Sequence, residues 1–221
     1  MKATRGSKPV AARAVATAQR DPDRTRSAIL AAATVEFSAK GLDGGRVDEI
    51  ARRSGVNKRM LYHYFGDKEG LYLAVLEASY AAIRTAELRL KLTDQHPIEG
   101  MRTLVRFTWD YLVAHPEFLS LLGTENLHRA ANLKKLPHIR KLHSPLIGLI
   151  SELLDLGVKQ RVIRKGVDPM QLYISIAALG FFYLSNRHTL AKIFGRALDA
   201  PASLDERGRH IVDVVLGYLR P

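Results

Sequence analysis

The sequence contains no cysteine and no long apolar run. Without cysteine the chain cannot form a disulfide, a thiolate metal site or a catalytic thiol, and this composition fits a reducing cytoplasm. No apolar run reaches the roughly 18 residues that a membrane span needs. The basic N-terminus lacks the apolar core of a signal peptide. We therefore expect a cytoplasmic protein that does not enter a membrane.

Acidic residues are missing from the start of the chain. Residues 1–20 contain no aspartate or glutamate but carry Lys2, Arg5, Lys8, Arg13 and Arg20. The whole chain has 34 Lys and Arg against 22 Asp and Glu, which gives a formal net charge of +12. This balance favours a polyanionic partner such as nucleic acid, and the alternative is a basic composition without a specific partner.

The same first segment offers few large apolar side chains to bury, so we expect residues 1–20 to form a disordered basic arm. Two roles remain open for it. The arm serves either as a solubilising tail or as an extension that follows DNA phosphates or enters a minor groove.

Strand alternation and internal repeats are also absent, and helical periodicity occupies the rest of the chain. A first helix is expected to begin with Asp21 as its cap and to stop at Gly41, and a longer helix is expected to follow a cap at Asp67. Further helices are predicted at Pro97–Ala114, Pro116–Ala130, His138–Gln160, Pro169–Arg187 and Leu204–Leu219. The predicted fold class is all-α.

No enzyme signature accompanies these helices. We find no glycine-rich phosphate loop, nucleophile elbow, zinc signature or pair of carboxylates at metal-ligand spacing. The eight histidines are scattered, and none forms a convincing metal set with nearby carboxylates. We therefore expect neither an enzyme, nor a metal site, nor a cofactor.

The stretch "VDEIARRSGVNKRMLYHYFGDKEGLYLAVLE", which begins at Val47, predicts a helix-turn-helix. Two short helical patterns, Val47–Ser54 and Lys58–Tyr64, flank Gly55, which tolerates the positive φ that such a turn needs. Ala51 is small enough for two helices to meet there. The second helix is basic and polar on one side, as a helix that reads a major groove must be. The alternative is an ordinary helical hairpin with a solvated charged face.

These residues resemble the DNA-binding domain of TetR/AcrR-type transcriptional regulators. The likeness runs from about Arg24 to Leu76 and includes Phe37 with Gly41, "IA" at Ile50, "GV" at Gly55 and "LYHYF" from Leu61. It implies a basic arm at 1–20, a three-helix DNA reader at 21–66 and a helical ligand-binding and dimerisation domain at 67–221. It also implies a homodimer on a double-stranded operator.

The resemblance places the recognition helix at Asn57–Tyr64. Lys58 and Arg59 are then the expected readers of base edges or phosphates. The other expected DNA contacts go mainly to phosphates, and they come from Arg46, Asn57, Tyr62, His63 and Lys68. At Arg46 the family often has Ser or Thr, so that residue departs from the pattern and leaves the cap of the preceding helix open.

The C-terminal helices predict a small-molecule site less clearly. Aromatic and polar groups gather within a few turns, and the candidate ligand residues are Trp109, Phe118, Leu122, Asn126, Arg129, Phe182 and Asn186. Polar groups on a buried helix need partners, and an anionic ligand would supply one. The alternative is plain core packing. "TENLHR" weakly resembles TetR regulators that control catabolic genes.

The segment "PMQLYISIAALGFFYLSNR" is apolar on nearly every face, as is typical of a helix buried on all sides. Together with the last helix it predicts a two-fold homodimer interface. The resulting hypothesis is a repressor that a small molecule releases from a palindromic operator. The alternative is an architectural DNA-binding protein, or an activator, without small-molecule control.

Overall fold

The computed structural model describes residues 21–221, with the side chains at 140 and 142–144 left aside, and within this part the chain is helical without strands. The predicted arm at residues 1–20 lies outside it. The α-helices are α1 Pro22–Gly44, α2 Val47–Ser54, α3 Lys58–Phe65, α4 Lys68–Leu88, α5 Pro97–Ala114, α6 Pro116–Leu127, α7 Ile139–Lys159, α8 Pro169–Phe194 and α9 Pro201–Leu219. Short 3₁₀ helices occupy Leu92–Asp94 and Leu133–Lys135. Within the described part, no helix combines the length and apolar character that crossing a membrane requires.

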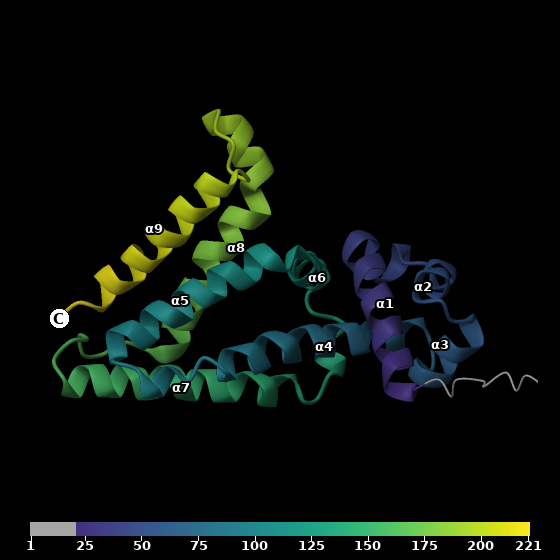
Figure 1. The fold of residues 1–221 in the computed structure, drawn as a ribbon, viewed down its shortest axis with the longest axis horizontal. Helices are drawn as coiled ribbons and strands as arrows, with labels where there is room; N and C mark the ends of the chain where they lie inside the picture. Colours follow the sequence, from purple (N-terminus) through teal and green to yellow (C-terminus); the bar gives the residue numbers. More distant parts are fainter. Residues whose placement is uncertain (1–20) are drawn as a thin grey trace, which may run out of the picture.

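Helices α1, α2 and α3 form a small unit at one end of the molecule (Figure 1). Ile29 and Phe37 of α1, Ile50 and Ala51 of α2, and Leu61 of α3 are buried in one cluster. Gly55 adopts φ 70° between α2 and α3, as the sequence predicts. This apolar cluster fixes how α3 is presented, because the short helix has few other anchors.

Helix α4 belongs to two hydrophobic clusters. Leu71, Tyr72, Val75 and Leu76 pack with the N-terminal unit. One turn later, Tyr80 and Ile83 of the same helix belong to the second cluster, which holds the C-terminal helices. The domain boundary expected between residues 66 and 67 stays a prediction. In the structure the two cores meet within α4.

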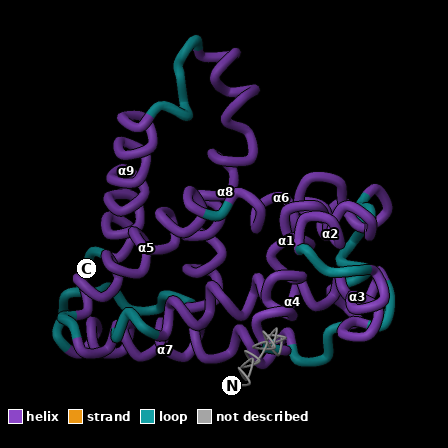
Figure 2. The backbone as a smooth tube through the Cα atoms, turned by 45° about the vertical axis from the view of Figure 1, so that its right-hand side comes forward, coloured by secondary structure: helices purple, strands orange, loops and turns teal. Residues whose placement is uncertain are grey.

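The C-terminal helices surround α5, which packs against α7, α8 and α9. Helix α7 also runs along α4 (Figure 1). Helices α8 and α9 diverge from the loop that joins them, and the tube view separates them clearly (Figure 2). Gly208 lets α9 approach α5 closely, because a Cβ added there would lie 2.8 Å from Trp109.

Several predicted helix ends are wrong, and α9 for example begins at Pro201 rather than Leu204. Helix α6 stops at Leu127 rather than Ala130, because Arg129 and Ala130 take positive φ of 55° and 56°. Helix α8 continues past Arg187 to Phe194, where Gly195 ends it in the left-handed region with φ 64°. The residues after Arg187 contain no glycine or proline that would end a helix before Gly195, so α8 continues to that glycine.

The buried carboxylate of Glu36 supports the start of α2. Glu36 is 2 % exposed. Its Oε1 accepts from Lys40 Nζ at 2.8 Å and from the backbone N–H of Arg46 at 3.1 Å. Arg46 is the N-cap of α2 but makes no side-chain capping bond. Glu36 therefore anchors the cap residue's backbone from a different helix. The hydrogen bond from Lys40 and that from Arg46 lower the pKa of Glu36, although its burial acts in the opposite direction.

We predict that Glu36→Ala lowers the free energy of unfolding by roughly 1–3 kcal/mol, because it removes a charged hydrogen-bond acceptor from a buried site. Since the folded-state pKa is depressed, this contribution is present above the unfolded pKa and is lost as pH falls through the folded pKa. Urea unfolding of the two proteins at several pH values measures it.

The control is Glu99→Ala, which removes an exposed ion pair with Arg102 within one helix. We expect that change to cost less than about 1 kcal/mol. Equal losses for the two variants, or a Glu36 effect that persists unchanged in acid, would contradict the assigned role.

Candidate nucleic-acid interface

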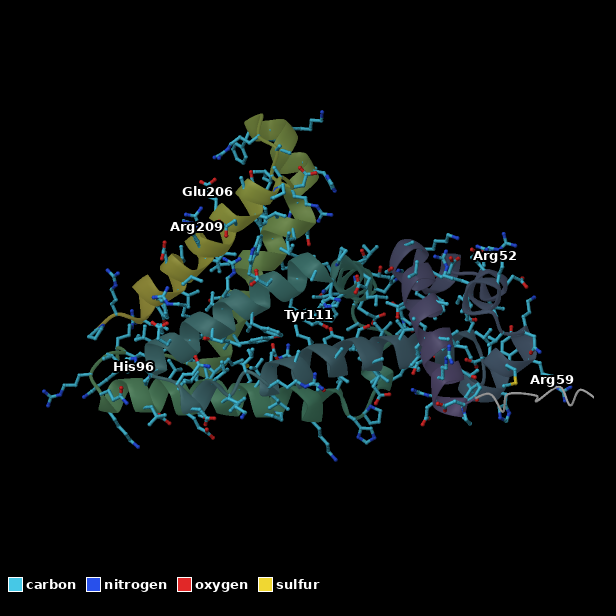
Figure 3. The ribbon with its side chains drawn as sticks, viewed as in Figure 1. Arg52, Arg59, His96, Tyr111, Glu206 and Arg209 are labelled. Atoms are coloured by element: carbon cyan, nitrogen blue, oxygen red, sulfur yellow. The ribbon has the colours of Figure 1, made fainter. Side chains whose placement is uncertain are left out.

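Helix α3 presents one packed and one open side. Leu61 is 2 % exposed and anchors the helix in the N-terminal core. Lys58, Arg59, Tyr62 and His63 are all exposed. Figure 3 shows Arg59 at the end of the molecule farthest from α9. The helix therefore offers cations and aromatic hydroxyl or imidazole groups together, which suits contacts to phosphates and base edges.

An intramolecular partner holds Lys58. Its Nζ lies 2.5 Å from Asp48 Oδ1, and both side chains are more than half exposed. The hydrogen bond from this ammonium to Asp48 raises the pKa of Lys58. Exposed pairs of this kind are weak and break easily, so Lys58 can exchange Asp48 for a phosphate or a base edge.

Three further residues predicted to contact DNA lie around α3, and they differ in the hydrogen bonds they already make within the protein. Asn57 caps α3, and its Oδ1 accepts from Met60 N at 2.9 Å, so its amide group keeps only its donors for other partners. Lys68 donates to the carbonyl oxygen of Asp43 at 3.0 Å and so ties the start of α4 to the last turn of α1. Arg46 is exposed at the N-terminus of α2.

The sequence interpretation overlooked two arginines in this unit. Arg26 of α1 lies over the ring of Phe65, with Cζ 5.4 Å from the ring centroid. Arg52 of α2 is exposed and pairs with Glu49, and it lies on the same end of the molecule as Arg59 (Figure 3). Both add positive charge to the end that carries α3. From helical periodicity alone, these two arginines are expected only to lie on solvent-exposed faces of their helices.

Three apolar members of the predicted ligand set pack in the core. Trp109 and Phe118 are 2 % and 7 % exposed. Trp109 contacts Tyr183 edge to face at 5.7 Å, and it faces Gly208 of α9. Phe118 packs against Tyr80 at 5.3 Å. Leu122 is partly buried. These three contacts and the partial burial of Leu122 are those of core residues, as the packing alternative expects.

The polar members of the predicted ligand set lie mostly at the surface. Asn126 is exposed and donates to the carbonyl oxygen of Leu122 within α6 at 2.8 Å. Arg129 is exposed because α6 has already ended. Asn186 donates to the carbonyl oxygen of Phe182, whose ring is 59 % exposed. These polar groups are therefore at the surface whereas Trp109 and Phe118 are buried, and a shared ligand site stays a prediction.

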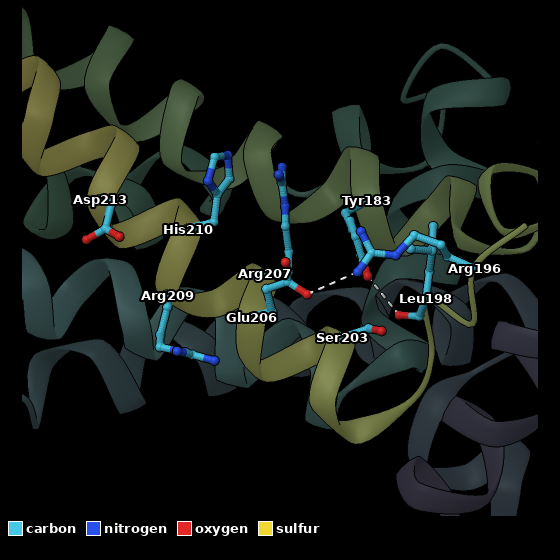
Figure 4. A pocket seen from close by; sticks show the side chains of 9 residues that line it. All are labelled: Tyr183, Arg196, Leu198, Ser203, Glu206, Arg207, Arg209, His210 and Asp213. Atoms are coloured by element: carbon cyan, nitrogen blue, oxygen red, sulfur yellow. Dashed lines mark hydrogen bonds and ion pairs between the residues drawn. The ribbon is translucent and has the colours of Figure 1, made fainter. Parts of the chain in front are cut away.

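An open hollow of about 460 Å³ lies between α8 and α9 (Figure 4). Charged side chains dominate its lining. The aromatic hydroxyl of Tyr183 donates to the carbonyl oxygen of Leu198 at 2.9 Å, and Arg196 pairs with Glu206 at 3.3 Å. Among the described residues, no group of three or more histidines and carboxylates could hold a metal ion.

The sequence interpretation also overlooked the buried carboxylate of Glu125 in α6. Its Oε1 accepts from Tyr72 Oη at 3.1 Å and from Asn132 Nδ2 at 3.0 Å. Its Oε2 accepts from the backbone N–H of Leu133 at 2.9 Å. Glu125 therefore joins α4 to the segment after α6. Its position four residues after the buried Leu121 on α6 was the only signal for it.

Comparison with known proteins agrees with this architecture. Residues 29–75 match the family described as bacterial regulatory proteins, tetR family. Residues 97–215 match the tetracyclin repressor-like C-terminal domain. The chain is 24 % identical to the putative transcriptional regulator SCO4942 from Streptomyces coelicolor, with a TM-score of 0.67 over 89 % of this chain and 99 % of that one.

Two curated relatives extend the likeness. The transcriptional repressor NicS of Pseudomonas putida is 40 % identical over 198 residues, which cover 90 % of this chain and 93 % of NicS. The repressor SCO4008 of Streptomyces coelicolor is 31 % identical over 163 residues, which cover 73 % and 79 % of the two chains. Exposed cations on a helix-turn-helix, a helical C-terminal domain and these matches lead to one conclusion. The chain belongs to the TetR family of helix-turn-helix transcriptional regulators.

Proposed function

We propose that this regulator is a repressor that binds a palindromic operator as a homodimer and is released by a small molecule. The observation that carries the proposal is the open side of α3, where Lys58, Arg59, Tyr62 and His63 are exposed together while Leu61 is packed. The names of the relatives NicS and SCO4008, both repressors, support the direction of control. Because regulators of this family are generally not enzymes, we propose a binding role in the cytoplasm rather than catalysis.

The residues around α3 receive distinct proposed roles. Lys58 and Arg59 contact base edges or phosphates, since their cationic donors match guanine O6 and N7. Tyr62 and His63 contact phosphates from the same face. Arg46, Asn57 and Lys68 contact DNA phosphates from the N-termini of α2, α3 and α4.

The proposed dimer uses α8 and α9. Met170, Ile174 and Phe182 are spaced by multiples of four residues on α8, and each is about half exposed at 53 %, 49 % and 59 %. Val214 and Tyr218 add 41 % and 48 % exposed groups on α9. Apolar rows on two neighbouring helices suit a self-complementary four-helix contact across a two-fold axis. The partner would also cover the hollow between the two helices.

We predict that Lys58→Ala and Arg59→Ala each weaken operator binding by roughly 1–3 kcal/mol if the residue makes a good bidentate base contact. Fragments selected from genomic DNA with the wild-type protein supply the operator, and fluorescence anisotropy measures the affinity. Lys159→Ala, which removes one charge at the end of α7, should leave the affinity unchanged. Wild-type affinity in both α3 variants would show that another segment reads DNA.

Deleting residues 1–20 tests the proposed phosphate contact of the basic arm. Each phosphate contact that is lost lowers the slope of log affinity against log salt by about 0.9 for duplex DNA. We expect a shallower slope and weaker binding at low salt. An unchanged slope would make the arm a solubilising tail only.

We predict that Phe182→Glu shifts the protein from dimer to monomer, because the charge would be desolvated in the interface. Val35→Glu is the control, since Val35 is a 48 % exposed apolar residue on α1, far from α8 in the chain. Sedimentation velocity distinguishes the two states. A dimer that survives Phe182→Glu, and also Ile174→Glu, would place the interface elsewhere.

A further inference from the structure

An ion pair is buried inside the C-terminal helices. Arg84 and Glu87 are one turn apart on α4 and are 6 % and 1 % exposed. Arg84 Nη1 lies 2.9 Å from Glu87 Oε2. An arginine stays charged in any protein environment, so its burial requires a nearby anion.

The two side chains leave several of their hydrogen-bonding atoms without partners. Its close contact lacks hydrogen-bond alignment, since Nε and Nη1 of Arg84 and both carboxylate oxygens of Glu87 make no hydrogen bond. The guanidinium donates from Nη2 to Tyr173 Oη at 3.2 Å. Apolar residues of similar size usually stabilise a core at least as well as such a pair. Buried donors without partners need an explanation, and a ligand that is absent here provides one.

Aromatic rings lie near the pair, and Tyr80 and Tyr111 are close enough to interact electrostatically with Arg84. The ring of Tyr173 lies beside the guanidinium, with Cζ 5.4 Å from its centroid. Phe118 lies between two tyrosines, 5.3 Å from Tyr80 and 6.4 Å from Tyr111. Planar groups are therefore available on α4, α5, α6 and α8. Such walls favour a flat ring over a flexible chain.

A small opening lies between this pair and α7. Arg84, Glu87 and Leu88 line it from α4, and Pro145, Leu146 and Leu149 line it from α7. Its volume is only about 10 Å³, enough for about one water molecule. A larger occupant therefore has to move α7 away from α4.

Burial raises the pKa of Glu87 to about 7, although Arg84 lowers it. The charged or titratable groups that act on this carboxyl are Arg84 on its own helix, Tyr111 of α5 and, through Arg84, Tyr173 of α8. Among the residues whose side chains the structure describes, α7 contributes Pro145, Leu146 and Leu149 to the lining, and these are apolar. Once Glu87 is protonated, the guanidinium has no anion, and the N–H donors on Nε and Nη1 that have no hydrogen-bond partner are available to a carboxylate.

We propose that Arg84 binds the carboxylate of a small planar effector that enters between α4 and α7 and lies against the ring of Tyr173, with Glu87 as the anion that the effector displaces. The inference rests on the proposed function, because it names the chemical class of the releasing molecule. Entry of the ring would separate α7 from α4, and α4 continues into the DNA-reading unit. Binding would therefore bias the orientation of α3.

Benzoate, with benzamide as its uncharged counterpart, tests the proposal by isothermal titration calorimetry on the full chain. We expect benzoate to bind and benzamide not to bind. Arg84→Met should abolish benzoate binding, and thermal unfolding shows whether this variant is folded. Glu87→Gln removes the competing charge but keeps the shape, so it should bind benzoate at least about tenfold more tightly than wild type at pH 8.

The pH dependence gives a second readout that a structural role would not produce. Wild-type affinity should fall about tenfold from pH 6 to pH 8, as Glu87 loses its proton at a pKa of about 7. In Glu87→Gln the affinity should be independent of pH. The proposal is overturned if benzoate at millimolar concentration fails to bind even Glu87→Gln, or if folded Arg84→Met binds it as well as wild type does.

Operator release is measured separately by fluorescence anisotropy. If benzoate binds through Arg84 without releasing DNA, the site stands and the proposed ligand response fails. If an uncharged metabolite releases the DNA while benzoate does not bind, the proposed function stands and the carboxylate site fails.

Discussion

The uninterrupted packing of α4 through both hydrophobic clusters is the constraint on which the rest of the structure depends. Its first half holds the DNA-reading unit through Leu71, Tyr72 and Leu76. Its second half enters the C-terminal core with Ile83. A helix packed at both ends moves as a rigid body, so displacement at one end is felt at the other. Glu125 strengthens this link, because it accepts a hydrogen bond from Tyr72 and others from the segment after α6.

This arrangement explains how a regulator can respond without a flexible hinge. Helix α3 has one buried anchor, Leu61, in the same cluster as the start of α4. The direction of its exposed cations therefore follows α4. In a homodimer, two such helices must lie about one DNA turn apart, roughly 34–36 Å, to enter successive major grooves. A ligand changes that separation only through its different affinity for the two states.

Charge is distributed differently in the two halves of the described chain. On the DNA-reading unit the cations are exposed, and their partners, such as Asp48, are weakly held. In the C-terminal core Arg84 and Glu87 are buried with unsatisfied atoms. A buried charge pair of poor geometry costs stability, whereas exposed pairs contribute little in either direction. A ligand-binding role for Arg84 explains why the core retains this destabilising pair.

Local sequence signals determined the helices, the caps at Asp21, Asp67 and Asp168, and the turn at Gly55, since each depends on neighbours within about four residues. They also predicted the exposed face of α3. They did not indicate that Asn126 and Arg129 are exposed, and the ligand role of these two residues stays a prediction. Only the tertiary structure decided that Arg84 is buried, because its partner Tyr173 lies 89 residues away in the chain. From the sequence, Arg84 and Glu87 are indistinguishable from an ordinary solvated pair on a helix. Their burial depends on how α5, α7 and α8 pack around α4, and helical spacing carries no information about distant partners.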